Sequence, residues 1–290
     1  MEVGQYSRII AGCMSWGAWG KQLSTAEMVI QIQRTLSAGI TTFDHADIYG
    51  DYTTEVQFGD AFQKSGVSRE EIQLISKCGI QHVGNTRDNK IKHYNYTKDY
   101  IISSVEASLK NLCTDYVDLL LLHRPSPLMH PEEISEAVRL LKAQGKILNF
   151  GVSNFNPSQI EMLSAQTPVH ANQIEFSLTA HTAMYNGCLD FLLRERIVAM
   201  SWSPLGTVFK QDTETTRSIR KCLLSLGRKY NCTEAQMLLA WVLKHPAKIH
   251  PVIGTTNKKR LKNAQDAMGI DLALEDWFEL LAASQGHNVP

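Results

Sequence analysis

Residues 117–152, VDLLLLHRPSPLMHPEEISEAVRLLKAQGKILNFGV, are the stretch of sequence that decides the fold. The stretch begins with the dense apolar run 117–122, which is typical of a parallel strand buried on both faces. A helical pattern follows over 131–144, with Gly145 positioned to cap it, and a second apolar run begins at Ile147. Parallel strands need a long crossover connection, so this pattern predicts two parallel strands joined through a helix.

The same strand-and-helix unit recurs on both sides of this stretch. Further strands are predicted at residues 8–13, 40–44, 72–77, 170–175, 197–201 and 249–253. Further helices are predicted at residues 24–37, at 54–63, from about 97, at 219–229 and at 234–243. The pair Ser24 and Glu27 predicts a capping box at the start of the first helix.

About eight such units predict an α/β fold, a (β/α)8 TIM barrel, with an additional C-terminal helical segment from about residue 272. We expect one domain that covers residues 1–290. A doubly wound sheet is the competing architecture, but it usually has a glycine-rich first turn of the form GxGxxG. The turn after the first predicted strand, GCMSWGAWG, does not have this form in the required context.

The composition excludes several classes of protein. The 29 Lys and Arg residues balance the 29 Asp and Glu residues, so the formal net charge is zero. This charge balance argues against a nucleic-acid-binding protein, which needs a basic face. No apolar run is long enough to span a bilayer, and no signal peptide is recognisable. The six cysteines lack zinc-ligand spacing, so we expect no metal site. We therefore expect a cytoplasmic protein, a monomer or weak homo-oligomer, with a small-molecule partner and no nucleic-acid or membrane partner.

Polar side chains occur where the predicted strands end. Asp44 ends the second strand, Lys77 ends the third and His123 follows the fourth, while Tyr49 lies five positions after Asp44. The carboxyl ends of the strands of such a barrel meet at one mouth, where its chemistry takes place. Each residue alone has an ordinary structural explanation, since short motifs often occur without function. Their joint arrangement after consecutive strands predicts an active site.

Seven segments, in order along the chain, resemble motifs of the aldo-keto reductase superfamily. The segments are FDHADIYG at 43–50, ISKCG around Lys77, YVDLLLLHRP ending beyond His123, GVSNF at 151–155, NQIEFS around Gln173, SWSPLG at 201–206 and VIGTTNKKR up to Arg260. The versions DHADIYGDY and KCGI are similar to a bacterial branch of predicted aldo-keto reductases and oxidoreductases. The resemblance implies a TIM-barrel enzyme that uses NAD(P)H to reduce an aldehyde or ketone to an alcohol, and that catalyses the reverse reaction.

The resemblance also implies roles for the four strand-end residues. Tyr49 would be the general acid that gives a proton to the carbonyl oxygen. Because a phenol is a poor acid at neutral pH, the Lys77 cation would lower the pKa of Tyr49, and Asp44 would hold Lys77 in place. His123 would orient the carbonyl through a hydrogen bond or help to relay the proton.

By the same resemblance, nine further residues would bind the cofactor: Ser153, Asn154, Gln173, Trp202, Ser203, Leu205, Thr255, Thr256 and Arg260. The first three would bind the nicotinamide carboxamide, because amide side chains offer donors and acceptors, and Trp202 would stack on the nicotinamide ring. Alternatively, Ser153 and Asn154 would form hydrogen bonds to the local backbone of a turn, and Trp202 would only pack inside the barrel. Arg260 and the two threonines would hold a 2'-phosphate at a helix start, which favours NADPH/NADP+ while NADH stays possible. Better-known members have a lysine where this chain has Gly254, which removes one phosphate contact.

Trp16 and Trp19, in the loop after the first predicted strand, could form an apolar wall of the substrate pocket. Structural packing explains each tryptophan equally well. The long polar segment 78–96 is expected to rim the active-site mouth, where loops determine specificity. The sequence does not identify the substrate.

Two other functions are alternatives. One is a cofactor-binding regulatory subunit with little turnover, of the potassium-channel beta-subunit type within the same superfamily. We expect no docking extension for such a role, because the first predicted strand begins at residue 8. The other is a metal-dependent barrel hydrolase, but His45 and Asp47 are its only candidate ligands, while the remaining strand ends carry Lys, Ser, Asn and Gln.

Overall fold

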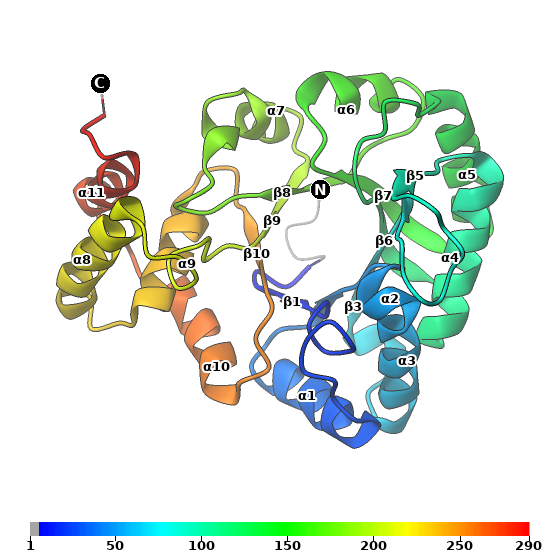
Figure 1. Ribbon diagram of the computed structural model, residues 1–290, viewed down its shortest axis with the longest axis horizontal. Helices are drawn as coiled ribbons and strands as arrows, with labels where there is room; N and C mark the ends of the chain where they lie inside the picture. The colour runs from blue at the N-terminus through cyan, green and yellow to red at the C-terminus, as the bar shows by residue number, and fades with distance from the viewer. Residues whose placement is uncertain (1–5, 290) are drawn as a thin grey trace.

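Eight parallel strands close into a barrel in the computed structural model, which describes residues 6–289 (Figure 1). The strands are β1 (Ile10–Gly12), β2 (Thr42–Asp44), β3 (Gln73–Cys78), β6 (Val117–Leu122), β7 (Ile147–Ser153), β8 (Ala171–Glu175), β9 (Val198–Trp202) and β10 (His250–Ile253). β1 pairs with both β2 and β10, so the sheet closes on itself. The predicted (β/α)8 barrel is therefore confirmed. Residues 1–5 and 290 of the expected domain 1–290 lie outside the described residues.

Helices form the outer layer around the barrel (Figure 1). They are α1 (Thr25–Ser37), α3 (Thr54–Lys64), α4 (Lys98–Leu112), α5 (Pro131–Ala143), α6 (Pro157–Ser164), α7 (Cys188–Arg194), α8 (Glu214–Lys229), α9 (Glu234–Lys244), α10 (Lys258–Asp266) and α11 (Leu274–Gln285). Shorter turns are α2 (Tyr49–Tyr52), η1 (Arg69–Glu71), η2 (Thr182–Met184) and η3 (Ala267–Gly269). α11 packs beside α8, which confirms the predicted C-terminal helical segment (Figure 1). Within residues 6–289, no helix is long and apolar enough to cross a lipid bilayer.

Local capping sequences determine where several helices begin. Ser24 Oγ accepts a hydrogen bond from the Glu27 N–H, and the Glu27 carboxylate accepts one from the Ser24 N–H, as predicted for α1. Thr213 and Thr216 form a similar reciprocal cap at the start of α8, so that α8 begins at Glu214 rather than at the predicted residue 219. A Thr-x-x-Thr sequence lacks the Glu or Gln of the usual capping box, which is why the sequence pattern does not indicate this first turn.

The side chains of the barrel strands alternate between the barrel interior and the helix layer. On β6, Leu119 and Leu121 belong to the interior cluster, while the leucines after each of them pack under the helices. This two-residue period continues past the strand, so His123 is in register with the inward side chains. On β3 the same period points Lys77 inward, two residues after the interior residue Ile75. The fold therefore directs strand-end polar side chains toward one mouth of the barrel.

The segment after β3 differs from the predicted long polar loop. It contains a two-stranded hairpin of β4 (Ile80–Gln81) and β5 (His93–Tyr94), which is separate from the barrel sheet. Two-residue strands are too short to produce the alternating pattern that identifies longer strands in a sequence. The hairpin gives the rim of the barrel mouth a defined structure on this side.

Candidate functional site

Asp44 and Lys77 form an ion pair inside the barrel mouth. Asp44 ends β2, Lys77 lies near the end of β3, and the two strands are neighbours. Lys77 Nζ lies 2.7 Å from Asp44 Oδ1 and also donates to the backbone carbonyl of His45 at 2.8 Å. Both charged side chains are buried. The attraction between the two charges offsets the free-energy cost of removing them from water, so the pair is able to stay ionised.

A left-handed turn brings Tyr49 to this ion pair. The turn is α2, in which residues 50–52 have positive φ angles of 60°, 56° and 65°. Glycine is required at Gly50, because a Cβ there would lie 2.4 Å from Thr54 Oγ1. The Tyr49 hydroxyl accepts a hydrogen bond from Lys77 Nζ at 3.2 Å. The phenol is thereby tied to the buried ion pair.

Burial determines the protonation of these groups. It outweighs the opposing influence of Lys77 and raises the pKa of Tyr49 to about 12. Lys77 acts in the expected direction, but the expectation of a lowered pKa for Tyr49 is wrong, because the phenolate would lose its hydration inside the barrel. Burial also disfavours the Lys77 cation, yet Asp44 and Tyr49 together raise the pKa of Lys77. At neutral pH the site therefore holds a protonated phenol beside an ammonium cation.

His123, directly after β6, lies beside Tyr49. The two ring centroids are 6.0 Å apart, with the ring planes at 77°. Burial, and next the Lys77 cation, holds the pKa of His123 well below its ordinary value, so the imidazole is neutral at physiological pH. Its Nδ1 is buried and has no hydrogen-bond partner within residues 6–289. A neutral imidazole is able to donate one hydrogen bond and accept another, so this ring has hydrogen-bonding capacity for a bound group.

A chain of hydrogen bonds joins the residues that are expected to bind nicotinamide. Trp202 Nε1 donates to Asn154 Oδ1 at 3.0 Å, and Asn154 Nδ2 donates to Ser153 Oγ at 2.8 Å. The Ser153 hydroxyl then donates to the Gln173 carbonyl at 2.8 Å. The Gln173 side-chain amide donates to Asp44 Oδ1, also at 2.8 Å. This last bond connects the expected cofactor residues to the ion pair, and no sequence pattern indicates it because it spans 129 positions.

The turn after β9 contains two more of the expected cofactor residues. Ser203 and Leu205 are both half-buried in this turn, which is closed by a 2.8 Å hydrogen bond from the Gly206 N–H to the Ser203 carbonyl. Trp202, at the end of β9, is also half-buried, and the Arg124 guanidinium lies 5.3 Å from its ring centroid. A residue that served only to pack the barrel interior would be fully buried. The partial exposure of Trp202 supports the stacking interpretation.

The segment after β10 presents a group of cations at a helix start. The N-cap of α10, Asn257, accepts a hydrogen bond from the Arg260 N–H at 3.1 Å, and Thr255 and Thr256 are half-buried in the preceding loop. The cationic side chains 258–260 are exposed, and within residues 6–289 none of them pairs with a carboxylate. Cations at a helix N-terminus oppose the helix dipole, so an anion would relieve their placement.

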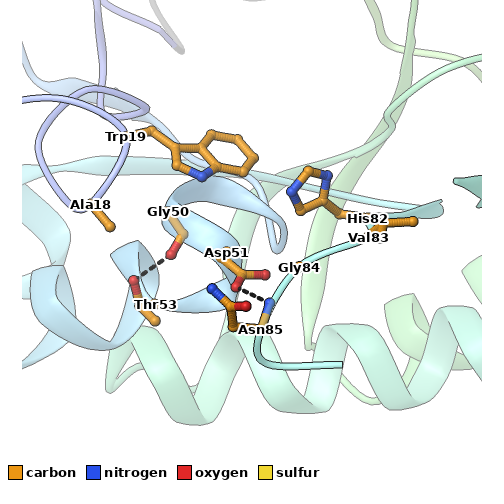
Figure 2. Close-up of a pocket in the computed structure, with 9 residues that line it drawn as sticks. All are labelled: Ala18, Trp19, Gly50, Asp51, Thr53, His82, Val83, Gly84 and Asn85. Carbon is orange, nitrogen blue, oxygen red and sulfur yellow. Dashed lines mark hydrogen bonds between the residues drawn. The ribbon is translucent and has the colours of Figure 1, made fainter. Parts of the chain in front are cut away.

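An open pocket of about 570 Å³ lies along the turn that follows Tyr49, with Gly50 and Asp51 of that turn among its lining residues (Figure 2). Its lining residues are Ala18, Trp19, Gly50, Asp51, Thr53, His82, Val83, Gly84 and Asn85. Trp19 is 39% exposed, and its ring centroid lies 6.4 Å from that of Tyr49. Trp16 is only 1% exposed and packs against Phe43 and Phe58. The expectation that Trp16 lines the pocket is therefore wrong, because its indole belongs to the core.

No role is predicted from the sequence for two of the pocket residues, although Asp51 lies within the quoted stretch DHADIYGDY. Asp51 follows the turn glycine, and Asn85 lies in the hairpin between β4 and β5. The Asn85 N–H donates to Asp51 Oδ2 at 2.7 Å, which joins the two sides of the pocket (Figure 2). The nearest sequence signal is the expected rim segment 78–96, which supplies His82 and Asn85 to the lining.

Within residues 6–289, no group of three or more His, Cys, Asp or Glu side chains is arranged to hold a metal ion. His45 and Asp47, the candidate ligands of a metal-dependent hydrolase, are both buried. The His45 ring packs edge-on against Phe58, with the centroids 4.3 Å apart. Asp47 Oδ2 accepts hydrogen bonds from the hydroxyls of Tyr100 and Ser104 at 3.3 and 3.2 Å. Both side chains therefore pack inside the protein instead of facing the barrel mouth.

Known proteins are similar to this chain over nearly its full length. The family model described as the aldo/keto reductase family matches residues 8–284. The uncharacterized oxidoreductase YcsN of Bacillus subtilis is 41% identical, over 99% of this chain and 97% of the relative. The 6-dehydroglucose reductase of Agrobacterium fabrum is 39% identical, over 98% of this chain and 96% of the relative. The solved structure of a thermostable aldo-keto reductase, Tm1743, with the inhibitor epalrestat aligns with a TM-score of 0.83 at 25% identity, over 97% of each chain.

Proposed function

Because the chain belongs to the aldo/keto reductase family and is an NAD(P)H-dependent oxidoreductase, we propose that it uses NADPH to reduce an aldehyde or ketone to an alcohol, and that it catalyses the reverse oxidation. In this proposal Tyr49 is the proton donor. The observation that carries it is the 3.2 Å hydrogen bond from Lys77 Nζ to the Tyr49 hydroxyl, beside the buried carboxylate of Asp44. This arrangement combines an available proton with a fixed positive charge.

Proton transfer from Tyr49 follows from the charges around it. The phenol is protonated at neutral pH, since burial raises its pKa to about 12. As the carbonyl oxygen gains negative charge, the phenol proton moves to that oxygen and the Lys77 cation stabilises the phenolate. Asp44 keeps Lys77 in position through the 2.7 Å ion pair. His123, as a neutral imidazole, orients the carbonyl oxygen through a hydrogen bond.

The residues at the barrel mouth fit a nicotinamide dinucleotide. When bound, the dinucleotide supplies the hydride that reduces the carbonyl carbon. Ser153, Asn154 and Gln173 would hold its carboxamide, since their hydroxyl and amide groups offer both donors and acceptors, and hydrogen bonds join Asn154 to Ser153 and Ser153 to the Gln173 backbone. Trp202 would offer its half-buried ring for stacking. The adjacent turn with Ser203 and Leu205 would flank the same ligand.

The cations at 258–260, which pair with no carboxylate among residues 6–289, support NADPH as the preferred cofactor. Arg260 would contact the 2'-phosphate through its guanidinium group, and Thr255 and Thr256 would donate their hydroxyls to the same phosphate. The start of α10 adds backbone N–H groups and a favourable dipole for an anion. NADH lacks this phosphate, so it would leave the cations without a partner. NADH is therefore the weaker cofactor in this proposal.

The test is turnover of a carbonyl panel by the purified protein. The panel contains simple aldehydes and ketones. It also contains 6-dehydroglucose, because the Agrobacterium relative is named 6-dehydroglucose reductase. Loss of NADPH absorbance and recovery of the matching alcohol would support the proposal. NADPH binding without turnover of any carbonyl would contradict it. That result would favour the alternative of a cofactor-binding regulatory subunit of the potassium-channel beta-subunit type.

A further inference from the structure

The pocket along the turn that follows Tyr49 has a mixed chemical character that the proton transfer does not use. One wall is the exposed indole of Trp19. The imidazole of His82 lies next to this indole, and Asp51 of the turn and Asn85 of the hairpin also line the pocket (Figure 2). An apolar face next to hydrogen-bonding groups suits a ligand that carries hydroxyls on a short carbon chain, because its C–H and O–H groups point in different directions.

The imidazole of His82 is held near Trp19 by bonds that leave its ring nitrogens available. The His82 N–H donates to the Tyr52 hydroxyl at 2.9 Å, and the His82 carbonyl accepts from Asn89 Nδ2 at 2.9 Å. Both hydrogen bonds that His82 makes within residues 6–289 therefore use its backbone. Its ring contacts Trp19 edge-on, with the centroids 5.2 Å apart and the planes at 71°.

Asp51, in the turn that carries Tyr49, is hydrogen-bonded to the hairpin segment that carries His82. Its carboxylate accepts hydrogen bonds from the Asn85 N–H at 2.7 Å and from the Thr86 hydroxyl at 3.0 Å. Gly84 lies so close that a Cβ there would be 2.0 Å from Asp51 Oδ1. This close approach fixes the distance between the hairpin and the residue two positions after Tyr49. His82 is thus positioned by the same turn that positions the proton donor.

We propose that His82 is a specificity-determining residue, which hydrogen-bonds a hydroxyl of the carbonyl substrate while Trp19 packs against the substrate's C–H face. The preferred substrates are then hydroxylated carbonyl compounds rather than plain aliphatic ones. This inference rests on the proposed function, since it concerns the substrate that Tyr49 protonates. Its geometric basis is the indole of Trp19, whose centroid lies within 6.4 Å of the ring centroids of both Tyr49 and His82. A short chain bound along this indole would reach both residues.

The test compares two aldehydes that differ in hydroxyl groups, glyceraldehyde and propanal. The quantity measured is the ratio of their kcat/KM values with NADPH. His82→Phe keeps an aromatic ring beside Trp19 but removes both ring nitrogens. We expect this ratio to fall about tenfold or more in His82→Phe, because a site built to hydrogen-bond a hydroxyl discriminates strongly against its absence. His82→Asn, which restores a donor and an acceptor, should recover part of the ratio.

The matched control is His93→Phe, because His93 is an exposed histidine on β5 outside the pocket lining. It should keep the wild-type ratio. A wild-type ratio in His82→Phe, from an enzyme that reduces both aldehydes, would overturn the role of His82 and leave the proposed reductase intact. A fall of equal size in His93→Phe would also overturn it, since the effect would then come from the hairpin as a whole. Failure of the wild-type protein to reduce any carbonyl would instead refute the proposed function itself.

Discussion

Lys77 Nζ lies 2.7 Å from Asp44 Oδ1 inside the barrel, where the two side chains are 1% and 3% exposed. Removing two charges from water is costly, and their mutual attraction and hydrogen bonds offset that cost only while both are present. The ammonium group also donates hydrogen bonds to the Tyr49 hydroxyl and the His45 carbonyl. Loss of either partner would therefore destabilise the fold, and the intact pair holds the cation beside the phenol.

Lys77→Met should impair both stability and activity. The substitution leaves the Asp44 carboxylate buried without its cation, which typically costs about 3–5 kcal/mol of the free energy of unfolding. Urea unfolding followed by circular dichroism measures this loss, and carbonyl-dependent NADPH oxidation measures the activity. The double variant Lys77→Met/Asp44→Leu should regain much of the stability while remaining inactive. A double variant no more stable than Lys77→Met would contradict the ion-pair explanation.

Asp47→Asn should make the protein's stability less dependent on pH. The Asp47 carboxyl is buried against Tyr100 and Ser104 of α4, and this burial, with the nearby Glu55, raises its pKa to about 7. The folded protein then binds a proton that the unfolded chain releases at about pH 4. This contribution to stability is complete below about pH 4 and is lost as the pH rises through about 7.

Asparagine resembles a protonated aspartic acid and does not titrate, so Asp47→Asn does not lose stability as the pH rises through about 7. Asp47→Asn should therefore be more stable than the wild type at pH 8, and the advantage should shrink at pH 5. Thermal unfolding at the two pH values measures the difference, with the exposed Asp88→Asn as a control. An advantage of equal size at both pH values would count against a buried, protonated carboxyl.

Arg260→Ala should weaken NADPH binding and have little effect on NADH binding. The guanidinium group is exposed at the start of α10 and would pair only with the 2'-phosphate. A hydrogen bond to a charged group contributes about 1.5–3 kcal/mol, so the Kd for NADPH should rise about tenfold or more. Thermal-shift titration with each dinucleotide measures the two affinities. Lys262→Ala is the control, since Lys262 lies on the same helix and pairs with Asp266. Equal losses for NADPH and NADH would refute the phosphate contact.

Gly254→Lys should strengthen NADPH binding. Among residues 6–289, a Cβ at Gly254 would come within 4 Å of Ser15 Oγ alone, at 3.8 Å, and the residue is exposed, so the backbone accepts a side chain there. Better-known members of the superfamily have a lysine at this position. The added ammonium group would therefore restore a phosphate contact that this chain lacks. We expect a severalfold lower Kd for NADPH and an unchanged Kd for NADH in the same titration. A weaker affinity for NADPH would show that the segment after β10 holds the cofactor differently.

The inward direction of the strand-end residues could be predicted because it depends on local sequence. An apolar run such as 117–122 identifies its strand, and the two-residue period then gives the direction of His123. The same period applies to Lys77 on β3. The pKa of Tyr49 was not accessible in this way, since a motif indicates the nearby cation but not the depth of burial. Burial depends on how the turn at 50–52 folds back onto the barrel.

Packing between distant segments could not be predicted from local patterns. Trp16 and Trp19 belong to one loop, yet they are 1% and 39% exposed. Trp16 is buried because it meets Phe43 and Phe58, which belong to other elements of the fold. His82 is likewise positioned by bonds across the chain and not by a motif of its own. Local sequence therefore predicts the strand ends better than the substrate side of the site.

Tyr49→Phe tests the central claim most directly, because it removes one hydroxyl and keeps the ring. The measurement is kcat/KM for NADPH-dependent reduction of the best aldehyde of the panel, with cofactor binding followed by thermal shift. The exposed Tyr94→Phe serves as the control. If Tyr49 gives the proton, kcat/KM should fall at least about a hundredfold, the size of effect expected for general acid catalysis, while the shift with NADPH stays close to that of the wild type. A Tyr49→Phe enzyme that reduces the aldehyde at the wild-type rate would contradict the assignment of Tyr49 as the proton donor.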